Sequence, residues 1–155
     1  MKRYLMWIYR GEELSTIPKG YVGFVYTITN IQTNKKYIGR KLFNFTKTKT
    51  VKGKKIKVLS DSLWLSYTGS NTLLNEEIKI SGRDNYSFEV IYLCHTKSEM
   101  NYLESKEIFL KDALLRDDYF NQWISCKITR MHLQKYSKKL SDEHLQNVKT
   151  DTINN

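Results

Sequence analysis

The chain has few of the residues that build stapled or repetitive structures: two cysteines, one proline and seven glycines among 155 residues. Two cysteines cannot provide the disulfide framework of a small secreted scaffold. So little proline and glycine excludes collagen-like and low-complexity structure. Hydrophobic residues make up 40% and aromatic residues 13%, which is enough for a core and excludes general disorder. The length fits one compact domain.

Long hydrophobic runs are also missing. A membrane-spanning helix needs about 20 consecutive apolar residues. The apolar run near the start, residues 4–9, has six, whereas a secretory hydrophobic region has roughly 7–15. Arg10 ends this run, and no small-residue cleavage site follows. We therefore expect a soluble protein in the cytoplasm, which can be that of an infected host cell. We expect no membrane partner.

Acidic residues are outnumbered by 26 Lys and Arg to 16 Asp and Glu, which gives a net charge of +10. Such a charge favours a polyanionic partner, although a lysine-rich surface kept for solubility has the same composition. Residues 35–57 hold ten basic residues and no acidic one. Lys and Arg of this kind bind phosphate backbones. The middle of the segment, residues 46–53, has few apolar anchors, which predicts a mobile loop.

Hydrophobic patterning predicts an α/β (α+β) fold. Residues 21–29 and 36–39 are rich in β-branched and aromatic residues and are separated by a turn, which predicts a hairpin. A third strand is expected at residues 86–93. Helices are expected at 71–80, ending at Gly82, and from an N-cap at Ser98 onward. We expect a small, mainly antiparallel three-stranded sheet flanked by helices.

Residues for several other chemistries are absent or scattered. The three histidines lie far apart in the sequence, and neither cysteine has a CxxC partner, so a zinc site lacks ligands. The sequence has no Walker loop and no GxGxxG motif. Cys94 is expected to be a buried strand residue. The aromatic residues outside the hairpin are expected in the core, and this applies to Trp64, Tyr67, Phe109 and Trp123.

Two short segments resemble the paired motif of GIY-YIG nucleases. Tyr-Ile-Gly at residues 37–39 matches literally, and Phe-Val-Tyr at residues 24–26 stands where Gly-Ile-Tyr is usual. The two tyrosines keep the family's separation. SLWLSYTGS at residues 62–70, YLESK at 102–106 and YFN at 119–121 resemble later family elements in the same order. Small phage-type, homing-endonuclease-like members are the most similar.

The resemblance implies a divalent-metal-dependent DNA endonuclease that hydrolyses phosphodiester bonds, by a nick or a double-strand break, in a homing or nicking role. It implies Mg²⁺ or Mn²⁺ as cofactor and double-stranded DNA as partner, with no small-molecule cofactor. The catalytic domain is expected at residues 20–130, between an N-terminal extension, 1–19, and a basic helical extension with a polar tail, 131–155. The sequence leaves the oligomeric state open.

The resemblance also assigns roles on the two strands. Tyr26 is the expected general base or holds the attacking water, and Tyr37 positions water or phosphate. Arg40 and Lys41 supply positive charge at the scissile phosphate, and Arg can bind two oxygens at once. Family members often place the catalytic arginine farther along, on a helix. The role is therefore left open: it belongs to Arg40, to Lys41, or to both together.

Downstream residues complete the expected site. Glu104 would bind one divalent ion, with Glu107 as the rival one turn along the same helix. Asn121 would bond the substrate, hold the metal site, or simply close an Asx-turn. The expected DNA-binding residues are Lys47, Lys49, Lys52, Lys54, Lys55, Lys57, Ser70 and Asn71. Two alternatives remain open: an inactive nucleic-acid-binding module on the same fold, and a basic protein that binds another protein or RNA.

Overall fold

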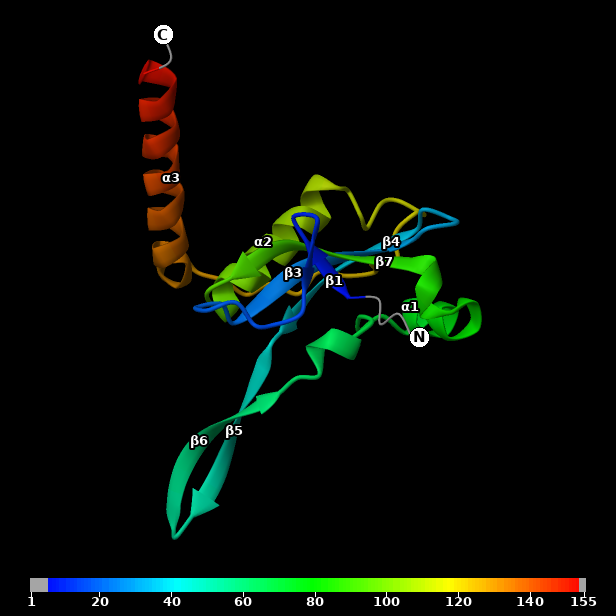
Figure 1. Ribbon diagram of the computed structural model, residues 1–155, viewed down its shortest axis with the longest axis horizontal. Coiled ribbons are helices and arrows are strands. Elements are labelled where there is room, and N and C mark those ends of the chain that lie inside the picture. Colours follow the sequence, from blue (N-terminus) through cyan, green and yellow to red (C-terminus); the bar gives the residue numbers. More distant parts are fainter. Residues whose placement is uncertain (1–5, 154–155) are drawn as a thin grey trace.

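The computed structural model describes residues 6–153, with side chains described up to residue 143. Its centre is a five-stranded sheet in the order β2-β1-β7-β3-β4 (Figure 1). The strands are β1 (Trp7–Tyr9), β2 (Glu12–Leu14), β3 (Gly23–Asn30), β4 (Lys36–Leu42) and β7 (Tyr86–Cys94). β1 pairs with β7 in parallel, and the other neighbours are antiparallel. The fold is therefore α+β with a mixed sheet.

The expectation of three strands was wrong, because β1 and β2 extend the sheet beyond β7. Each has three residues, which is too short for an alternating pattern to be visible in the sequence. Trp7 of β1 is fully buried, and its indole Nε1 donates a hydrogen bond of 2.8 Å to the carbonyl of Trp64. Residues 7–14 thus belong to the same sheet as the rest. The division at residues 20 and 130 stays a prediction.

The expected hairpin is confirmed in β3 and β4. Tyr26 pairs with Gly39, and Ile28 pairs with Tyr37. The turn is held by the Asn30 side chain, whose Oδ1 accepts bonds from the backbone N–H groups of the two residues at 32 and 33, at 2.9 and 3.1 Å. This is the local bonding that makes asparagine a turn residue.

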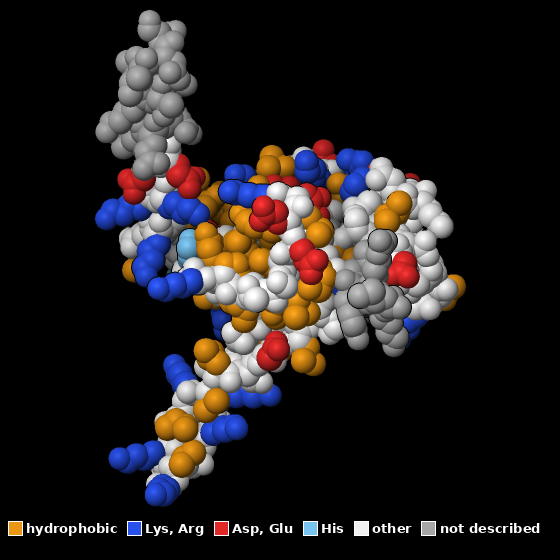
Figure 2. Space-filling view, viewed as in Figure 1, with side chains coloured by type: hydrophobic (Ala, Val, Ile, Leu, Met, Phe, Trp, Pro, Cys, Tyr) orange, Lys and Arg blue, Asp and Glu red, His pale blue; other side chains and the backbone are white. Residues whose placement is uncertain are grey.

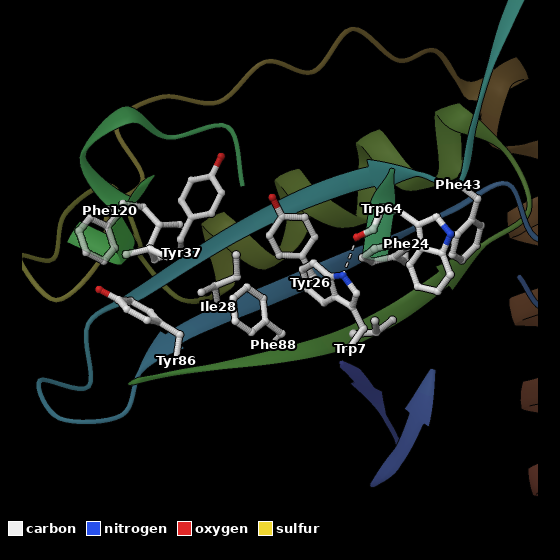
Figure 3. Close-up of a cluster of buried hydrophobic side chains, with 13 residues drawn as sticks. Trp7, Phe24, Tyr26, Ile28, Tyr37, Phe43, Trp64, Tyr86, Phe88 and Phe120 are labelled. Atoms are coloured by element: carbon white, nitrogen blue, oxygen red, sulfur yellow. Dashed lines mark hydrogen bonds between the residues drawn. The ribbon is translucent and has the colours of Figure 1, made fainter. Parts of the chain in front are cut away.

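The sheet is covered on both faces. Helix α2 (Lys97–Leu110) covers one face, where Val25 and Ile38 pack against Met100 and Leu103. The other face carries a cluster of aromatic side chains (Figure 3), which is covered by the 3-10 turn η1 (Trp64–Ser66) and by α1 (Thr72–Ser81). Successive strand residues point to opposite faces, so β3 supplies both clusters.

Residues 44–61 form a separate two-stranded hairpin, β5 (Asn44–Val51) and β6 (Lys54–Asp61), which projects from the body (Figure 1). The expected loop at residues 46–53 was therefore wrong. Lys52 and Gly53 at the tip have φ of 48° and 75°. A two-residue turn with φ positive at both positions matches the twist of a hairpin. In β5 the Thr and Lys residues alternate, so neither face is apolar and hydrophobic patterning could not predict the strand.

The helix ends follow ordinary capping rules. Asn71 caps α1, and Gly82 ends it as expected. Thr96, rather than the expected Ser98, caps α2, because its hydroxyl accepts a bond of 3.0 Å from the Glu99 N–H. The short turns η2 (Arg83–Asn85) and η3 (Arg130–Leu133) precede β7 and the long α3 (Gln134–Ile153). In the described part of the chain, no helix combines the length and apolar character that crossing a membrane requires.

Candidate active site

A pocket of about 200 Å³ lies at the outer edge of β4. Tyr37 and Arg40 are three residues apart on this strand, so they start from opposite faces of the sheet. Both reach the pocket because β4 is the last strand of the sheet. Of the predicted residues, the pocket lining contains Tyr37, Arg40, Ser70, Asn71, Glu104 and Asn121.

The segment at residues 118–121 fixes the edge of β4. The Lys36 N–H donates to the Asp118 carbonyl at 2.9 Å, and the Phe120 N–H donates to the Lys36 carbonyl at 2.8 Å. The Asn121 side chain continues this pairing: its Oδ1 accepts from the Ile38 N–H at 2.9 Å, and its Nδ2 donates to the Ile38 carbonyl at 2.8 Å. Asn121 thus acts as a further peptide unit along the strand. Its geometry supports holding the site together rather than bonding substrate.

The charged centre of the pocket is an ion pair between Arg40 and Glu104. Helix α2 lies on the Arg40 face and brings Glu104 to it, and the two side chains are 32% and 14% exposed. Burial raises the pKa of the Glu104 carboxyl, and Arg40 partly offsets this. Glu107 faces the sheet instead, where its carboxylate accepts a bond of 2.6 Å from the Tyr92 hydroxyl. Only Glu104 of the two rivals lines the pocket.

Tyr37 enters the pocket beside the start of α1. Its hydroxyl and the Ser70 hydroxyl are hydrogen-bonded at 3.0 Å. Gly69 adopts φ of +94°, and a Cβ there would come within 3.2 Å of the Tyr37 ring. Asn71 serves as the α1 cap, accepting from the Leu74 N–H at 2.9 Å, and its Nδ2 donates to the segment 118–121 at 2.9 Å. Its polar atoms are therefore already used within the fold.

Tyr26 does not line the pocket; it lies beside Tyr37 on the same face of the sheet (Figure 3), with the ring centroids 6.2 Å apart. The Tyr26 side chain is fully buried, and its hydroxyl has no hydrogen-bond partner among the described residues. It lies over Gly39, where a Cβ would come within 2.3 Å of the hydroxyl. Burial, assisted by the neighbouring Tyr67 and Tyr37 phenols, raises the pKa of Tyr26 well above its ordinary value.

Lys41 belongs to the tyrosine face and not to the Arg40 face. Its Nζ lies 4.0 Å from the centroid of the Tyr67 ring and 5.2 Å from that of Phe45. Burial lowers the pKa of Lys41. The Tyr67 ring lies 6.1 Å from Tyr26, so the three tyrosines at 37, 26 and 67 form a row that ends at Lys41. The adjacent residues Arg40 and Lys41 therefore contact different groups: Arg40 contacts Glu104, and Lys41 contacts the tyrosine row.

Tyr67 was expected in the core, and it does pack against the aromatic cluster, but the sequence interpretation did not place it beside Tyr26 and Lys41. It is half-buried and lies between Tyr26 and Lys41. Its place in the segment that resembles the family was the available signal.

Three other aromatic residues were expected in the core. Trp64 is buried as expected, but Phe109 and Trp123 are 67% and 70% exposed, so the expectation was wrong for both. Trp123 lies at the rim of the pocket.

The predicted DNA-binding lysines at positions 47, 49, 52, 54, 55 and 57 are all exposed and lie on the β5–β6 hairpin, outside the pocket. Figure 2 shows their positive side chains along the projecting arm. The structure therefore separates the predicted residues into a compact pocket and a distant basic arm.

The donor atoms limit how a metal can bind. Glu104 is the only carboxylate among the described residues that line the pocket, and the described chain holds no group of three or more His, Cys, Asp or Glu able to bind a metal. Mg²⁺ commonly uses one or two carboxylates, substrate phosphate oxygens and water. The pocket thus fits a cation bound by Glu104 together with substrate, and does not fit a cation bound by protein ligands alone.

One of three comparisons with known proteins gives a match. No curated protein and no solved structure matches the chain significantly. The family described as "Putative endonuclease segE, GIY-YIG domain" matches residues 7–124, well over half of the chain. The match begins at β1 and ends within the segment that closes the pocket. The chain therefore belongs to the GIY-YIG endonuclease family.

Proposed function

We propose that the protein is a divalent-metal-dependent endonuclease that hydrolyses phosphodiester bonds of double-stranded DNA, in the homing or nicking role of phage-type members. The observation that carries the proposal is the Arg40–Glu104 pair inside a polar pocket, backed by a row of tyrosines. Phosphoryl chemistry needs a cation site, a guanidinium for the phosphate and a place for water.

Arg40 and Glu104 would divide the work on the phosphate. The Glu104 carboxylate would hold Mg²⁺ or Mn²⁺, which when bound polarises the phosphate and stabilises the leaving oxygen. Once its carboxylate partner is engaged in this way, the Arg40 guanidinium is free to bind two phosphate oxygens. In the absence of substrate, the ion pair lets the partly buried Arg40 and Glu104 side chains compensate each other's charge.

The tyrosine row would handle the water. A Tyr26 phenol whose pKa is raised by burial stays neutral, so it suits holding a water molecule better than accepting a proton. Tyr37, oriented by Ser70, would position the water or the phosphate. Tyr67 is more exposed than Tyr26, and the Lys41 ammonium over its ring would favour a phenolate there; that phenolate would accept the proton of the attacking water and become a neutral phenol, while the water oxygen attacks phosphorus. This transfers the general-base role from Tyr26 to Tyr67.

A cleavage assay with matched glutamate variants tests the proposal. Wild-type protein is incubated with supercoiled plasmid and with phage genomic DNA, with Mg²⁺ and with EDTA. Glu104→Gln should abolish metal-dependent cleavage while DNA binding is retained. Glu107→Gln is the matched control on the same helix; it should still cut, because its Tyr92 contact can be kept by an amide oxygen. Thermal melts of both variants establish that they fold.

The outcomes separate the open alternatives. Cleavage by Glu104→Gln at the wild-type rate would refute the metal assignment. Salt-sensitive DNA binding by wild type without any metal-dependent cleavage would favour the inactive binding module. The ratio of open-circle to linear plasmid over time distinguishes nicking from double-strand breakage. A single recurring site in phage DNA would support the homing role.

A further inference from the structure

The β5–β6 hairpin is an arm without a core of its own. Its strands pair over eight positions, from Asn44 with Asp61 to Val51 with Lys54. No residue of either strand is buried, and apolar side chains such as Ile56 and Leu59 are 44% and 70% exposed. An isolated two-stranded hairpin is marginally stable in water. Such a hairpin needs packing against a further surface to be stable by itself.

The charge of the arm selects the partner. Between residues 45 and 60 the chain has six lysines and no acidic residue. Two copies of such an arm repel one another, and lysines along an exposed strand edge oppose edge-to-edge pairing. A phosphate backbone attracts them by releasing its condensed counterions. Charge complementarity therefore favours nucleic acid over a second copy of the chain, and this step rests on the proposed function.

The shape of the arm fits the major groove. That groove of B-form DNA is about 12 Å wide and admits a two-stranded β-ribbon. Eight strand residues at about 3.3 Å each span roughly 26 Å, which is less than one DNA turn of about 34 Å. β5 begins four residues after Arg40. With a phosphate at Arg40, the ribbon can reach bases within one helical turn of the cleaved bond.

The register gives the two faces of the ribbon different chemistry. Thr46, Thr48 and Thr50 share one face with their cross-strand partners, which are Leu59, Lys57 and Lys55 in that order. A threonine offers a donor, an acceptor and a methyl group to base edges. The opposite face carries Lys47, Lys49 and Lys54 together with four apolar side chains, Phe45, Val51, Ile56 and Val58. Lysines thus lie on both faces of the ribbon, and the row of threonine hydroxyls lies on one face only.

We propose that the β5–β6 hairpin lies in the major groove within one helical turn of the scissile phosphate. Its threonine face contacts base edges and so sets the target preference, and its lysines hold the phosphate backbone. The arm is then the specificity element of the nuclease, and the pocket at the edge of β4 is its cutting centre.

Two matched triple variants test this proposal. Thr46→Val/Thr48→Val/Thr50→Val replaces three hydroxyls with methyl groups and retains strand propensity. Lys47→Gln/Lys49→Gln/Lys54→Gln removes three charges from the other face. Cleavage of a randomised DNA library should show an altered preference for the threonine variant, by roughly threefold to tenfold for each hydroxyl that no longer bonds a base edge. The lysine variant should keep the preference and reduce the salt slope of binding by about 2.7.

A binding experiment locates the groove without requiring cleavage. In EDTA, methylation of guanine N7, which lies in the major groove, should interfere with wild-type binding on one side of the cut site. The same interference should disappear in the threonine variant. Circular dichroism melts of both variants show that the body remains folded.

Several results would overturn the proposal. The first is a threonine variant that cleaves the DNA library with the wild-type sequence preference. The second is methylation interference with binding at adenine N3 in the minor groove only. The third is a dimer that forms through the hairpin in the absence of DNA. Failure of the nuclease proposal is seen separately, as a wild-type protein that binds DNA and never cuts it. The methylation experiment then still decides where the arm lies.

Discussion

Strands β4 and β5 are separated in the chain by Phe43 alone, yet their surroundings differ completely. β4 is paired with β3 on one side and held by the segment 118–121 on the other, and Tyr37, Ile38 and Gly39 are buried. β5 is paired only with β6, and none of its residues is buried. One continuous stretch of chain thus changes from a fixed strand to an exposed arm.

The difference corresponds to two physical demands. A reacting phosphate must meet its catalytic groups with small positional error, which requires side chains fixed by packing and hydrogen bonds. Binding a phosphate backbone relies on charge and reach, and tolerates motion because the attraction is not tied to one geometry. Under the proposed function, the strand that carries Tyr37 and Arg40 would meet the first demand, and the lysines of the hairpin would meet the second.

The largest contrast should come from one substitution made in both regions. At Gly39 an alanine Cβ would lie 2.3 Å from the Tyr26 hydroxyl inside the packed face. Overpacking costs about 1–3 kcal/mol or more, so Gly39→Ala should lower the free energy of unfolding by at least that amount and abolish cleavage. At Gly53, with φ of +75° and nothing within 4 Å, alanine costs only local strain of about 1–2 kcal/mol.

Urea unfolding and plasmid cleavage of the two alanine variants measure this contrast. Gly53→Ala should cut at close to the wild-type rate, because its strain is confined to the hairpin tip. Equal losses of stability and activity in both variants would contradict the division between a fixed strand and an independent arm.

A second contrast lies within the tyrosine row. The Tyr26 hydroxyl is buried without a partner among the described residues, so Tyr26→Phe should leave the free energy of unfolding unchanged or raise it by about 1 kcal/mol. Cleavage should nevertheless fall by about a hundredfold, because the water that this hydroxyl would hold is no longer positioned. Tyr37→Phe should lower stability by about 1 kcal/mol, because it removes the bond to Ser70. A Tyr26→Phe protein that is less stable and fully active would show that this hydroxyl has a structural role only.

The sequence could predict what local pattern determines. The alternation and turn residues of β3 and β4 were sufficient to predict their hairpin. In the structure this hairpin pairs Tyr26 with Gly39. Gly82 was correctly predicted to end α1. β5 and β6 were missed because their side chains are polar or charged on both faces, so no buried face imposes a period of two.

The site depended more on contacts between distant residues. Asn121 meets Ile38 across 83 residues, a distance at which no local rule operates, and only the family resemblance indicated Glu104. The separation of Arg40 from Lys41 was accessible in principle, because neighbouring strand residues face opposite ways. Their adjacency in the sequence suggested one shared role, whereas the structure gives each its own cluster.

The smallest expected effect compares the two thiols. Cys94 is fully buried in β7, and burial, with Glu99 nearby, raises its pKa to about 12, whereas Cys126 is exposed. A thiol reagent at pH 8 should label Cys126 alone in the folded protein and both thiols in urea. The folded state holds the Cys94 proton more strongly than the unfolded state does. The buried thiol therefore makes its whole contribution to stability at pH values below the unfolded pKa of about 8.5. That contribution falls away as the pH rises toward the folded value. Cys94→Ala should remove that alkaline dependence, and rapid labelling of native Cys94 would place it outside the core.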